Sequence, residues 1–307
     1  MTLDKEYLNY PKRKYGMDHD FFDWSILQKR KKIVWPNNSK VAVWISYSLE
    51  FFPLNQPSAP FKAPGGMVTP YPDLRHFTTR DYGNRVGISR IWECLSKHKL
   101  KASAAVNSTV AQRYPYIIKK ITERNDEIIG HGVDMGKIHY GGMDDKTEAS
   151  LVKESLDILR KVSNQKVLGW WSPAKSESWN TCKHLASNGI EYTCDWCNDD
   201  MPYKMNSDAG NLWAMPHGSE IWDRTIIMDK KQTEEEFVEQ VQDAFATLYE
   251  ESETYGGRIL SIVLTPYIMG LHYRIKYLDK LFEWINTRDC IWNATGIEIL
   301  NEIKNNN

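Results

Sequence analysis

A serial alternation of short apolar runs and longer helical segments constrains the fold of this chain more than any other feature. The first run, KVAVWISYSLEFF (residues 40–52), is continuously apolar and β-branched, as in a strand that is buried on both faces. Six or seven such units in series, with short connections, predict parallel strands and right-handed crossovers. Because no Gly-x-Gly-x-x-Gly follows the first run, we expect a closed or nearly closed (β/α) barrel of about seven parallel strands, not a dinucleotide-binding sheet.

Two segments fall outside this alternation. Residues 1–35 are polar and weakly periodic, which predicts an N-terminal arm lying on the domain or on a neighbouring subunit, followed by a barrel domain over residues 36–307. Residues 53–85 are dense in proline and glycine and predict a long loop. Long ordered loops inside compact domains usually have a functional role, so we expect this loop to cover a pocket.

Composition excludes several classes of function. Lys plus Arg (39) nearly cancels Asp plus Glu (40), and no basic patch is visible, so no nucleic-acid partner is expected. No apolar stretch approaches the roughly 20 residues that cross a bilayer, and residues 1–16 lack a signal-peptide segment, which predicts a cytoplasmic protein without a membrane partner. Five cysteines, an odd number, suit reduced thiols. The 12 tryptophans and 16 tyrosines favour a pocket for a small polar ligand.

Polar residues follow the predicted strands at the positions where barrel enzymes carry their chemistry. They are Glu50, His131, Asp134, Asp195, Asn198, Asp199, Asp200, His217, Glu220, Thr265 and Tyr267. Each of them alone could be a helix cap, a turn residue or a surface residue. Their repeated coincidence with strand ends predicts a site at that end of the barrel.

Several sequence blocks carry a family resemblance. In chain order they are KVAVWISYSLEFF, TTRDYGNRVG, EIIGHG with YGGMDD, YTCDWCNDDMPY and LTPYIMGLHYRIKYLD. From about Trp35 to about Ile303 the chain resembles the NodB-type polysaccharide deacetylase superfamily, in particular the branch of the cofactor-independent allantoinases and related amide hydrolases. The resemblance implies a distorted (β/α) barrel, hydrolysis of a carbon–nitrogen bond other than a peptide bond, a small or carbohydrate-like substrate and a homo-oligomer.

The chain departs from the metal-binding pattern of that superfamily. Where its deacetylases hold a divalent metal with an aspartate and a His-x-x-x-His pair, this chain has Glu50, His131 and Met135. A thioether is a poor ligand for zinc, so we expect no metal cofactor. The alternative is a zinc-type site in which His139 folds back to join Glu50 and His131. The superfamily also has a late Leu-His motif whose histidine is a catalytic acid, and in this chain Thr265 occupies that position. His272 could replace it as the acid, or it could be a surface residue.

The resemblance and the strand-end rule together give candidate roles. Glu50 and His131 are the predicted catalytic pair: Glu50 activates water or orients His131, and His131 protonates the leaving nitrogen or stabilises the oxyanion, with the reverse assignment open. Arg80 and Tyr82 would recognise substrate, unless Arg80 pairs with Asp81, Asp199 or Asp200. The further predicted substrate-binding residues are Trp171, Trp196, Asn198, Asp199, Glu220 and Tyr267.

Three functions remain open at this point. The first is a hydrolase of an amide, a cyclic amide or an N-acyl group in a small cytosolic metabolite, without the standard metal set. The second is a barrel that binds a small molecule and has lost catalysis. The third is a metal-dependent N-deacetylase that uses Glu50, His131 and His139. The lack of an export signal counts against a cell-wall polysaccharide as substrate.

Overall fold

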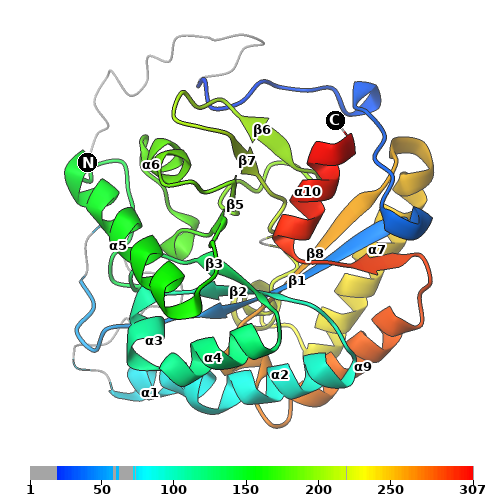
Figure 1. Ribbon diagram of the computed structural model, residues 1–307. Helices are drawn as coiled ribbons and strands as arrows, with labels where there is room; N and C mark the ends of the chain where they lie inside the picture. The colour runs from blue at the N-terminus through cyan, green and yellow to red at the C-terminus, as the bar shows by residue number, and fades with distance from the viewer. Residues whose placement is uncertain (1–18, 58–59, 62–71, 73, 219, 307) are drawn as a thin grey trace.

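A curled sheet forms the centre of the molecule (Figure 1). The structure is a computed structural model, and it describes residues 19–57, 60–61, 72, 74–218 and 220–306. All nine residues of β1 (Val41–Leu49) are buried, as the apolar run predicts. The other strands are β2 (Ser103–Val106), β3 (Glu127–Gly130), β4 (Gly169–Trp170), β5 (Tyr192–Thr193), β6 (Tyr203–Met205), β7 (Leu212–Ala214), β8 (Arg258–Leu264) and β9 (Ile291–Asn293).

The strand order is β6-β7-β5-β4-β3-β2-β1-β8, with β9 also paired to β1. All these pairs are parallel except β6 with β7. Beyond β7, Trp222 forms a parallel bridge with Val263 on β8, and the Val263 amide donates to the Ile221 carbonyl oxygen at 3.1 Å. The segment after β7 therefore lies along the outer edge of β8. The predicted distorted barrel of about seven parallel strands is confirmed.

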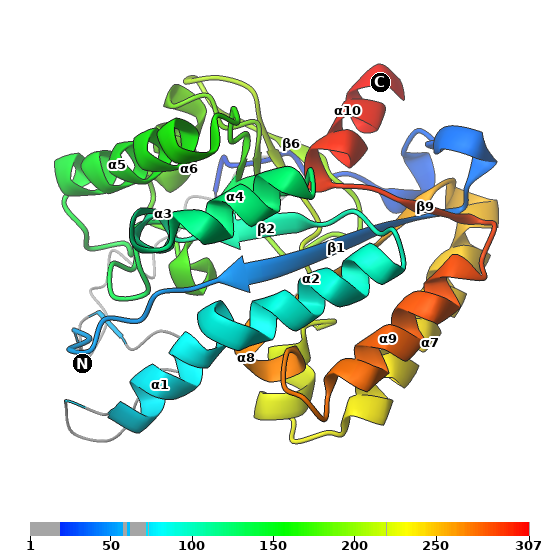
Figure 2. The same ribbon diagram turned by 60° about the horizontal axis from the view of Figure 1, so that its bottom comes forward.

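Helices surround the sheet on the outside (Figure 1 and Figure 2). They are α1 (Leu74–Tyr82), α2 (Ile88–Lys97), α3 (Ser108–Arg113), α4 (Pro115–Glu123), α5 (Asp145–Ser163), α6 (Thr181–Ser187), α7 (Glu234–Tyr255), α8 (Pro266–Met269), α9 (Ile275–Asn286) and α10 (Gly296–Asn306). One apolar cluster packs between sheet and helices, and a second, with Trp44, Trp171 and Tyr192, fills the inside of the curled sheet. Among the described residues, no helix has the length and apolar character that crossing a membrane requires.

Two sequence-based boundaries are wrong. The predicted loop over residues 53–85 ends early, because α1 begins at Leu74 and runs through a π-helical turn, Gly83–Gly87, into α2. Its helical course is fixed by tertiary packing, since Gly83 and Gly87 lie directly against α8. The sequence VAQRYPYIIKKITERN (residues 110–125) has a pattern that predicts one helix. The structure divides it into α3 and α4, because Pro115 has no backbone N–H and starts a new helix. Much of the loop itself, residues 58–59, 62–71 and 73, lies outside the described residues.

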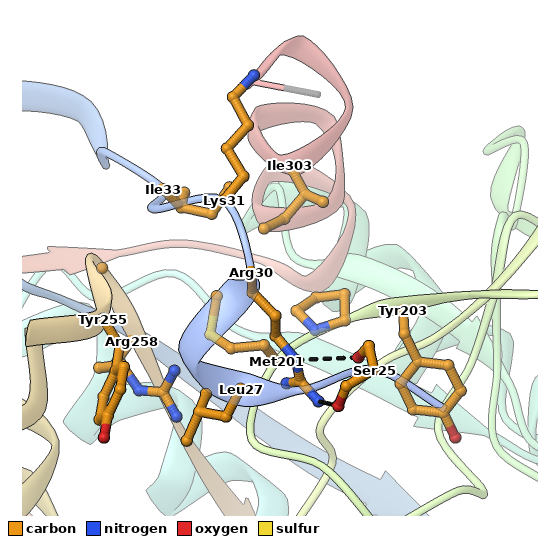
Figure 3. A pocket seen from close by; sticks show the side chains of 12 residues that line it. Ser25, Leu27, Arg30, Lys31, Ile33, Met201, Tyr203, Tyr255, Arg258 and Ile303 are labelled. Atoms are coloured by element: carbon orange, nitrogen blue, oxygen red, sulfur yellow. Dashed lines mark hydrogen bonds between the residues drawn. The ribbon is translucent and has the colours of Figure 1, made fainter. Parts of the chain in front are cut away.

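The described part of the arm, residues 19–35, lies against the barrel. Phe21 and Phe22 pack on the Trp196 ring, and Arg30 forms an ion pair with Asp199 at 2.7 Å. Figure 3 shows Arg30 reaching between the arm and the barrel, into a pocket that Met201 also lines. The domain boundary near residue 36 stays a prediction, and residues 1–18 lie outside the described part.

Candidate active site

A cavity of about 180 Å³ lies at the carboxyl ends of the central strands. Glu50 directly follows β1, His131 directly follows β3, and Trp171 directly follows β4. Parallel strands end at the same edge of the sheet, so residues distant in sequence meet there. The lining residues are Glu50, His131, Met135, Trp171, Ala174, Lys175, Trp222 and Arg224.

His131 is held in one tautomer by the backbone. Its side chain is only 1% exposed, and its Nδ1 lies 2.6 Å from the carbonyl oxygen of Trp171. A carbonyl oxygen can only accept a hydrogen bond, so Nδ1 must carry the proton. In the neutral ring Nε2 is therefore unprotonated and can act as a base. This nitrogen lies 3.9 Å from Oε1 of Glu50, which is too far for a direct hydrogen bond.

Glu50 is a buried carboxylate that stays ionised. Burial by itself raises the pKa of Glu50, but its interaction with the nearby His131 ring, followed by the charges of Arg224 and Arg80, outweighs burial and brings the pKa below its ordinary value. Asn107, which was not predicted from the sequence, connects the segment after β1 with the segment after β3. Its side chain accepts from the Phe51 amide at 2.8 Å and donates to the His131 carbonyl oxygen.

Three polar atoms of the cavity have unmet hydrogen-bonding capacity. Oε2 of Glu50, Nε2 of His131 and Nε1 of Trp171 are buried without a hydrogen-bond partner among the described residues. A buried polar atom left unpaired costs roughly 1–3 kcal/mol, so such atoms are rare unless water or a ligand satisfies them. Two are acceptors and one is a donor, a set that fits a water molecule beside a carbonyl group.

The donor set does not fit the superfamily's metal centre. Met135 lies in the cavity beside Glu50 and His131, so the third position carries a thioether. His139 is turned elsewhere, with its Nδ1 2.9 Å from Glu148 and its ring against Trp170. The alternative set of Glu50, His131 and His139 therefore does not gather its ligand atoms in one place.

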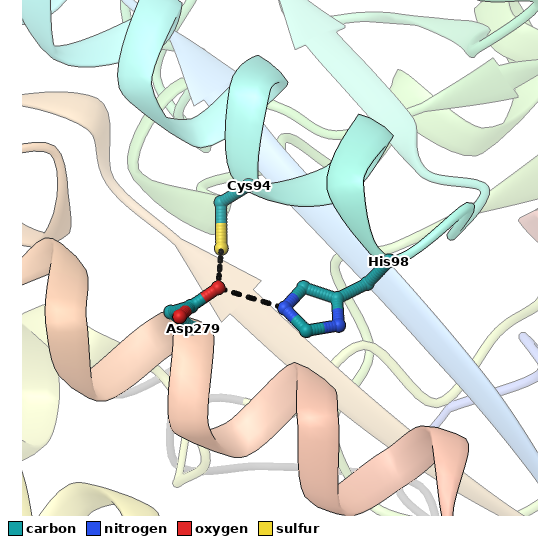
Figure 4. Close-up of side chains that lie close together, drawn as sticks. All are labelled: Cys94, His98 and Asp279. Carbon is teal, nitrogen blue, oxygen red and sulfur yellow. Dashed lines mark hydrogen bonds and ion pairs between the residues drawn. The ribbon is translucent and has the colours of Figure 1, made fainter.

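One other cluster in the described part of the chain has ligand-type atoms within 4.8 Å of one another: Cys94, His98 and Asp279 (Figure 4). It lies on the outside of the barrel, between α2 and α9. Lys97 contacts both oxygens of Asp279, at 2.7 and 2.8 Å, so that the carboxylate is already neutralised. Burial raises the pKa of the Cys94 thiol to about 12, which disfavours the thiolate that a metal needs. This cluster therefore joins two helices as an ion-pair network.

Arg80 and Tyr267 lie together near Glu50. The Arg80 guanidinium is 4.2 Å from the centre of the Tyr267 ring. Burial and then the charge of Glu50 raise the pKa of Tyr267, so its hydroxyl keeps its proton. The carboxylates that were alternative partners for Arg80 are engaged elsewhere: Asp81 lies near Arg85, Asp199 pairs with Arg30, and Asp200 lies near Arg258.

The remaining predicted substrate-binding residues do not line this cavity. The Tyr82 hydroxyl accepts a hydrogen bond from Arg90. Trp196 packs against the arm, and Asn198 accepts from the Tyr203 hydroxyl at 2.7 Å. Asp199 holds Arg30, and the exposed Glu220 pairs with Lys230 at 3.0 Å. The possible substitute acid, His272, is exposed on the surface.

The site also contains residues that had no role assigned from the sequence; of these, His217 was named only as a strand-end residue. Lys175, Trp222 and Arg224 line the cavity. His217 is fully buried beside them, with Nε2 2.8 Å from the Ser46 hydroxyl oxygen and its ring 4.6 Å from the Trp171 ring. Burial, and then the charges of Lys175 and His131, hold the pKa of His217 well below its ordinary value, so it stays neutral.

Asp223 gives a prediction for the pH dependence of stability. Burial raises the pKa of Asp223 from 3.8 to about 7, although Thr265 hydrogen-bonds to it. Between these values the folded state binds the proton that the unfolded state releases, so unfolding becomes easier as pH rises from about 4 to about 7. We expect Asp223→Asn to remove this slope, a gain of up to roughly 4 kcal/mol at pH 8 relative to pH 4.

Urea unfolding at several pH values measures this effect, with Asp229→Asn as the control because the Asp229 side chain is 57% exposed. The control should follow the wild-type curve. Parallel pH curves for the wild type and Asp223→Asn would contradict the assignment.

Comparison with known proteins agrees with the fold. Residues 74–193 match the family model for polysaccharide deacetylase. A Schizosaccharomyces pombe protein, provisionally named a polysaccharide deacetylase, is 25% identical over 293 residues, which cover 86% of this chain and 90% of that protein. The resemblance to the polysaccharide deacetylases that was inferred from the sequence is confirmed.

Solved structures show the same barrel. The crystal structure of PuuE allantoinase superposes with a TM-score of 0.78 at 22% identity, covering 87% of this chain and 91% of that one. A provisionally named polysaccharide deacetylase from Pseudomonas aeruginosa PAO1 has a TM-score of 0.76 at 22% identity, with coverage of 88% and 93%. The NodB-like form of the barrel is thereby confirmed.

Proposed function

We propose that this protein is a hydrolase that cleaves a carbon–nitrogen bond other than a peptide bond in a small metabolite. The observation that carries the proposal is the set of unpaired atoms on Glu50, His131 and Trp171, all in residues that line one cavity. The family match and the names of the similar proteins support the class of reaction. A cytosolic substrate and a homo-oligomeric assembly are expectations from the sequence that belong to the same proposal.

The catalytic pair is arranged to activate water. Glu50 Oε1 and His131 Nε2 are 3.9 Å apart, and both are acceptors in the states assigned above. One water molecule can donate its two hydrogens to them. When its oxygen attacks the amide carbon, a carbon–oxygen bond forms and one proton passes to Glu50 or His131.

The same groups can complete the reaction. As the carbon–oxygen bond forms, the carbonyl oxygen becomes negative, and the unpaired Trp171 N–H is a donor that can stabilise it. The carbon–nitrogen bond then breaks, and the proton taken from water passes to the leaving nitrogen, most directly from the His131 imidazolium. The products are a carboxylic acid, or a carbamic acid when a ureido group is cleaved, together with an amine or ammonia, so atoms and protons balance. Because the residues do not fit the metal centre, each step is assigned to the chain's own groups.

A panel assay tests this proposal. Wild-type enzyme, once treated with a chelator and once supplied with zinc, is offered allantoin, hydantoins, ureido acids, formamides and N-acetylated amines, and the release of acid, amine or ammonia is measured. We expect at least one class to be hydrolysed at equal rates in both preparations. Hydrolysis only after zinc is added would favour the metal-dependent deacetylase. No hydrolysis under either condition would favour the barrel that only binds.

A further inference from the structure

Positive side chains surround the proposed active site. Arg224 and Lys175 line the cavity, and Arg80 lies close enough to lower the pKa of Glu50 by its charge, as Arg224 also does. Glu50 is the one carboxylate in the lining formed by the described residues. Asp223, the next acidic neighbour, is a weak counter-charge because burial raises its pKa to about 7. The cavity therefore carries more positive than negative charge.

Arg224 is the most informative of these cations. Its side chain is 9% exposed, and its guanidinium lies 5.6 Å from the centre of the Trp222 ring. Its ion pair with Asp229 is long, at 3.9 Å from Nε, and the Asp229 side chain is itself 57% exposed. A solvent-exposed carboxylate at this distance offsets a buried charge only weakly. Burying a guanidinium costs several kcal/mol unless an anion compensates it, and arginine is well shaped to bind a carboxylate with two hydrogen bonds.

The rest of the lining limits the substrate further. Trp171, Trp222 and Met135 give apolar walls, which fit a short carbon skeleton. The volume, about 180 Å³, lies below the roughly 300–1,000 Å³ typical of pockets for drug-sized ligands. A negatively charged group placed beside Glu50 would be repelled, so an anion fits only on the side of the cavity where Arg224 lies.

We propose that the substrate is a small anion, a ureido or N-acyl acid whose carboxylate binds Arg224 while its carbon–nitrogen bond lies at Glu50 and His131. This inference rests on the proposed hydrolase function. It adds a specificity that the sequence alone leaves open, because neutral ureides, cyclic amides and acetylated amines would lack the group that compensates Arg224.

Matched pairs of compounds test the inference. N-carbamoylglycine is compared with N-carbamoylglycinamide, and N-formylglycine with N-formylglycinamide, so that each acid has a neutral partner of nearly the same size. We expect the wild type to favour the acids by about 100-fold in kcat/KM, the scale of a buried charged hydrogen bond. In Arg224→Gln the preference should fall to within a few fold through loss of activity on the acids alone. Arg224→Lys should keep part of it, and the exposed Arg288→Gln should keep all of it.

The outcomes separate this inference from the proposed function. Hydrolysis of acids and neutral partners at equal efficiency, or a preference that survives in Arg224→Gln, would overturn the inference and leave the hydrolase intact. If neither member of a pair is hydrolysed, binding is measured instead, as the change in the Tm of the protein that each compound causes at millimolar concentration. A shift with the acids alone that disappears in Arg224→Gln supports anion binding, and equal or absent shifts overturn it.

Discussion

Glu50→Gln is expected to lower kcat by about 10²–10⁴-fold, the usual contribution of a general acid or base, without unfolding the protein. Glutamine has nearly the shape of glutamate, but its amide cannot take a proton from water. It also places an N–H₂ group, a donor, where the Glu50 carboxylate would accept a hydrogen bond from the water. His131→Ala should have a similar effect. Because the two groups act on one water molecule, the double variant should be little worse than either single one.

The controls for this prediction are a surface variant and a pH profile. Glu123→Gln removes an exposed carboxylate on α4 and should leave kcat unchanged. Since the pKa of Glu50 lies below its ordinary value of 4.5, activity should persist at mildly acidic pH unless another group limits it. Retained kcat in both Glu50→Gln and His131→Ala, with a substrate from the panel, would rule out this catalytic pair.

Gly87→Ala is expected to destabilise the protein by about 3 kcal/mol or more, as overpacking against an immovable backbone does. A Cβ at position 87 would lie 2.1 Å from the carbonyl oxygen of Pro266, and a Cβ at Gly270 would lie 2.4 Å from the carbonyl oxygen of Gly87. Both neighbours are main chain, so no side-chain rotation relieves the clash. The turn before α2 and the short helix α8 would have to separate.

Gly141→Ala is the matched control, because nothing lies within 4 Å of a Cβ there. We expect its free energy of unfolding, measured with urea, to stay within about 0.5 kcal/mol of wild type. A Gly87→Ala protein with wild-type stability would show that this helix contact is looser than described.

The parts of the site that follow strands could be predicted, and those fixed by long-range packing could not. Glu50 and His131 were predicted because they directly follow strong apolar runs whose ends must meet. Trp222 and Arg224 were missed because their segment pairs with β8 through one bridge and has no strand pattern of its own. Helix α1 was missed because its packing on α8, not its local sequence, decides its conformation.

Residues near the strand ends also include some that serve other contacts. Trp196 and Asp199 follow β5, as the strand-end rule requires, but both contact the N-terminal arm. Trp196 packs against Phe21 and Phe22, and Asp199 forms an ion pair with Arg30. Nothing in the local sequence indicates that a segment more than 150 residues away packs there. The high tryptophan content was also an imperfect guide to the pocket. The fully buried Trp35, Trp44 and Trp170 fill the core and do not line the cavity.

The segment of residues 220–224, here called the seam, closes the gap between β7 and β8. It forms one wall of the cavity, and the ends of β1 and β3 form another. The proposed catalytic residues Glu50 and His131 directly follow the regular strands β1 and β3. Trp222 and Arg224 lie on a connection that is held by the Ile221–Val263 hydrogen bond and by the Trp222 and Asp223 contacts to Thr265. If the proposed roles hold, exchanges in residues 220–224 should alter which molecule is accepted while leaving Glu50 and His131 in place. This makes the seam the natural place to vary in a library that seeks new substrates for the same chemistry.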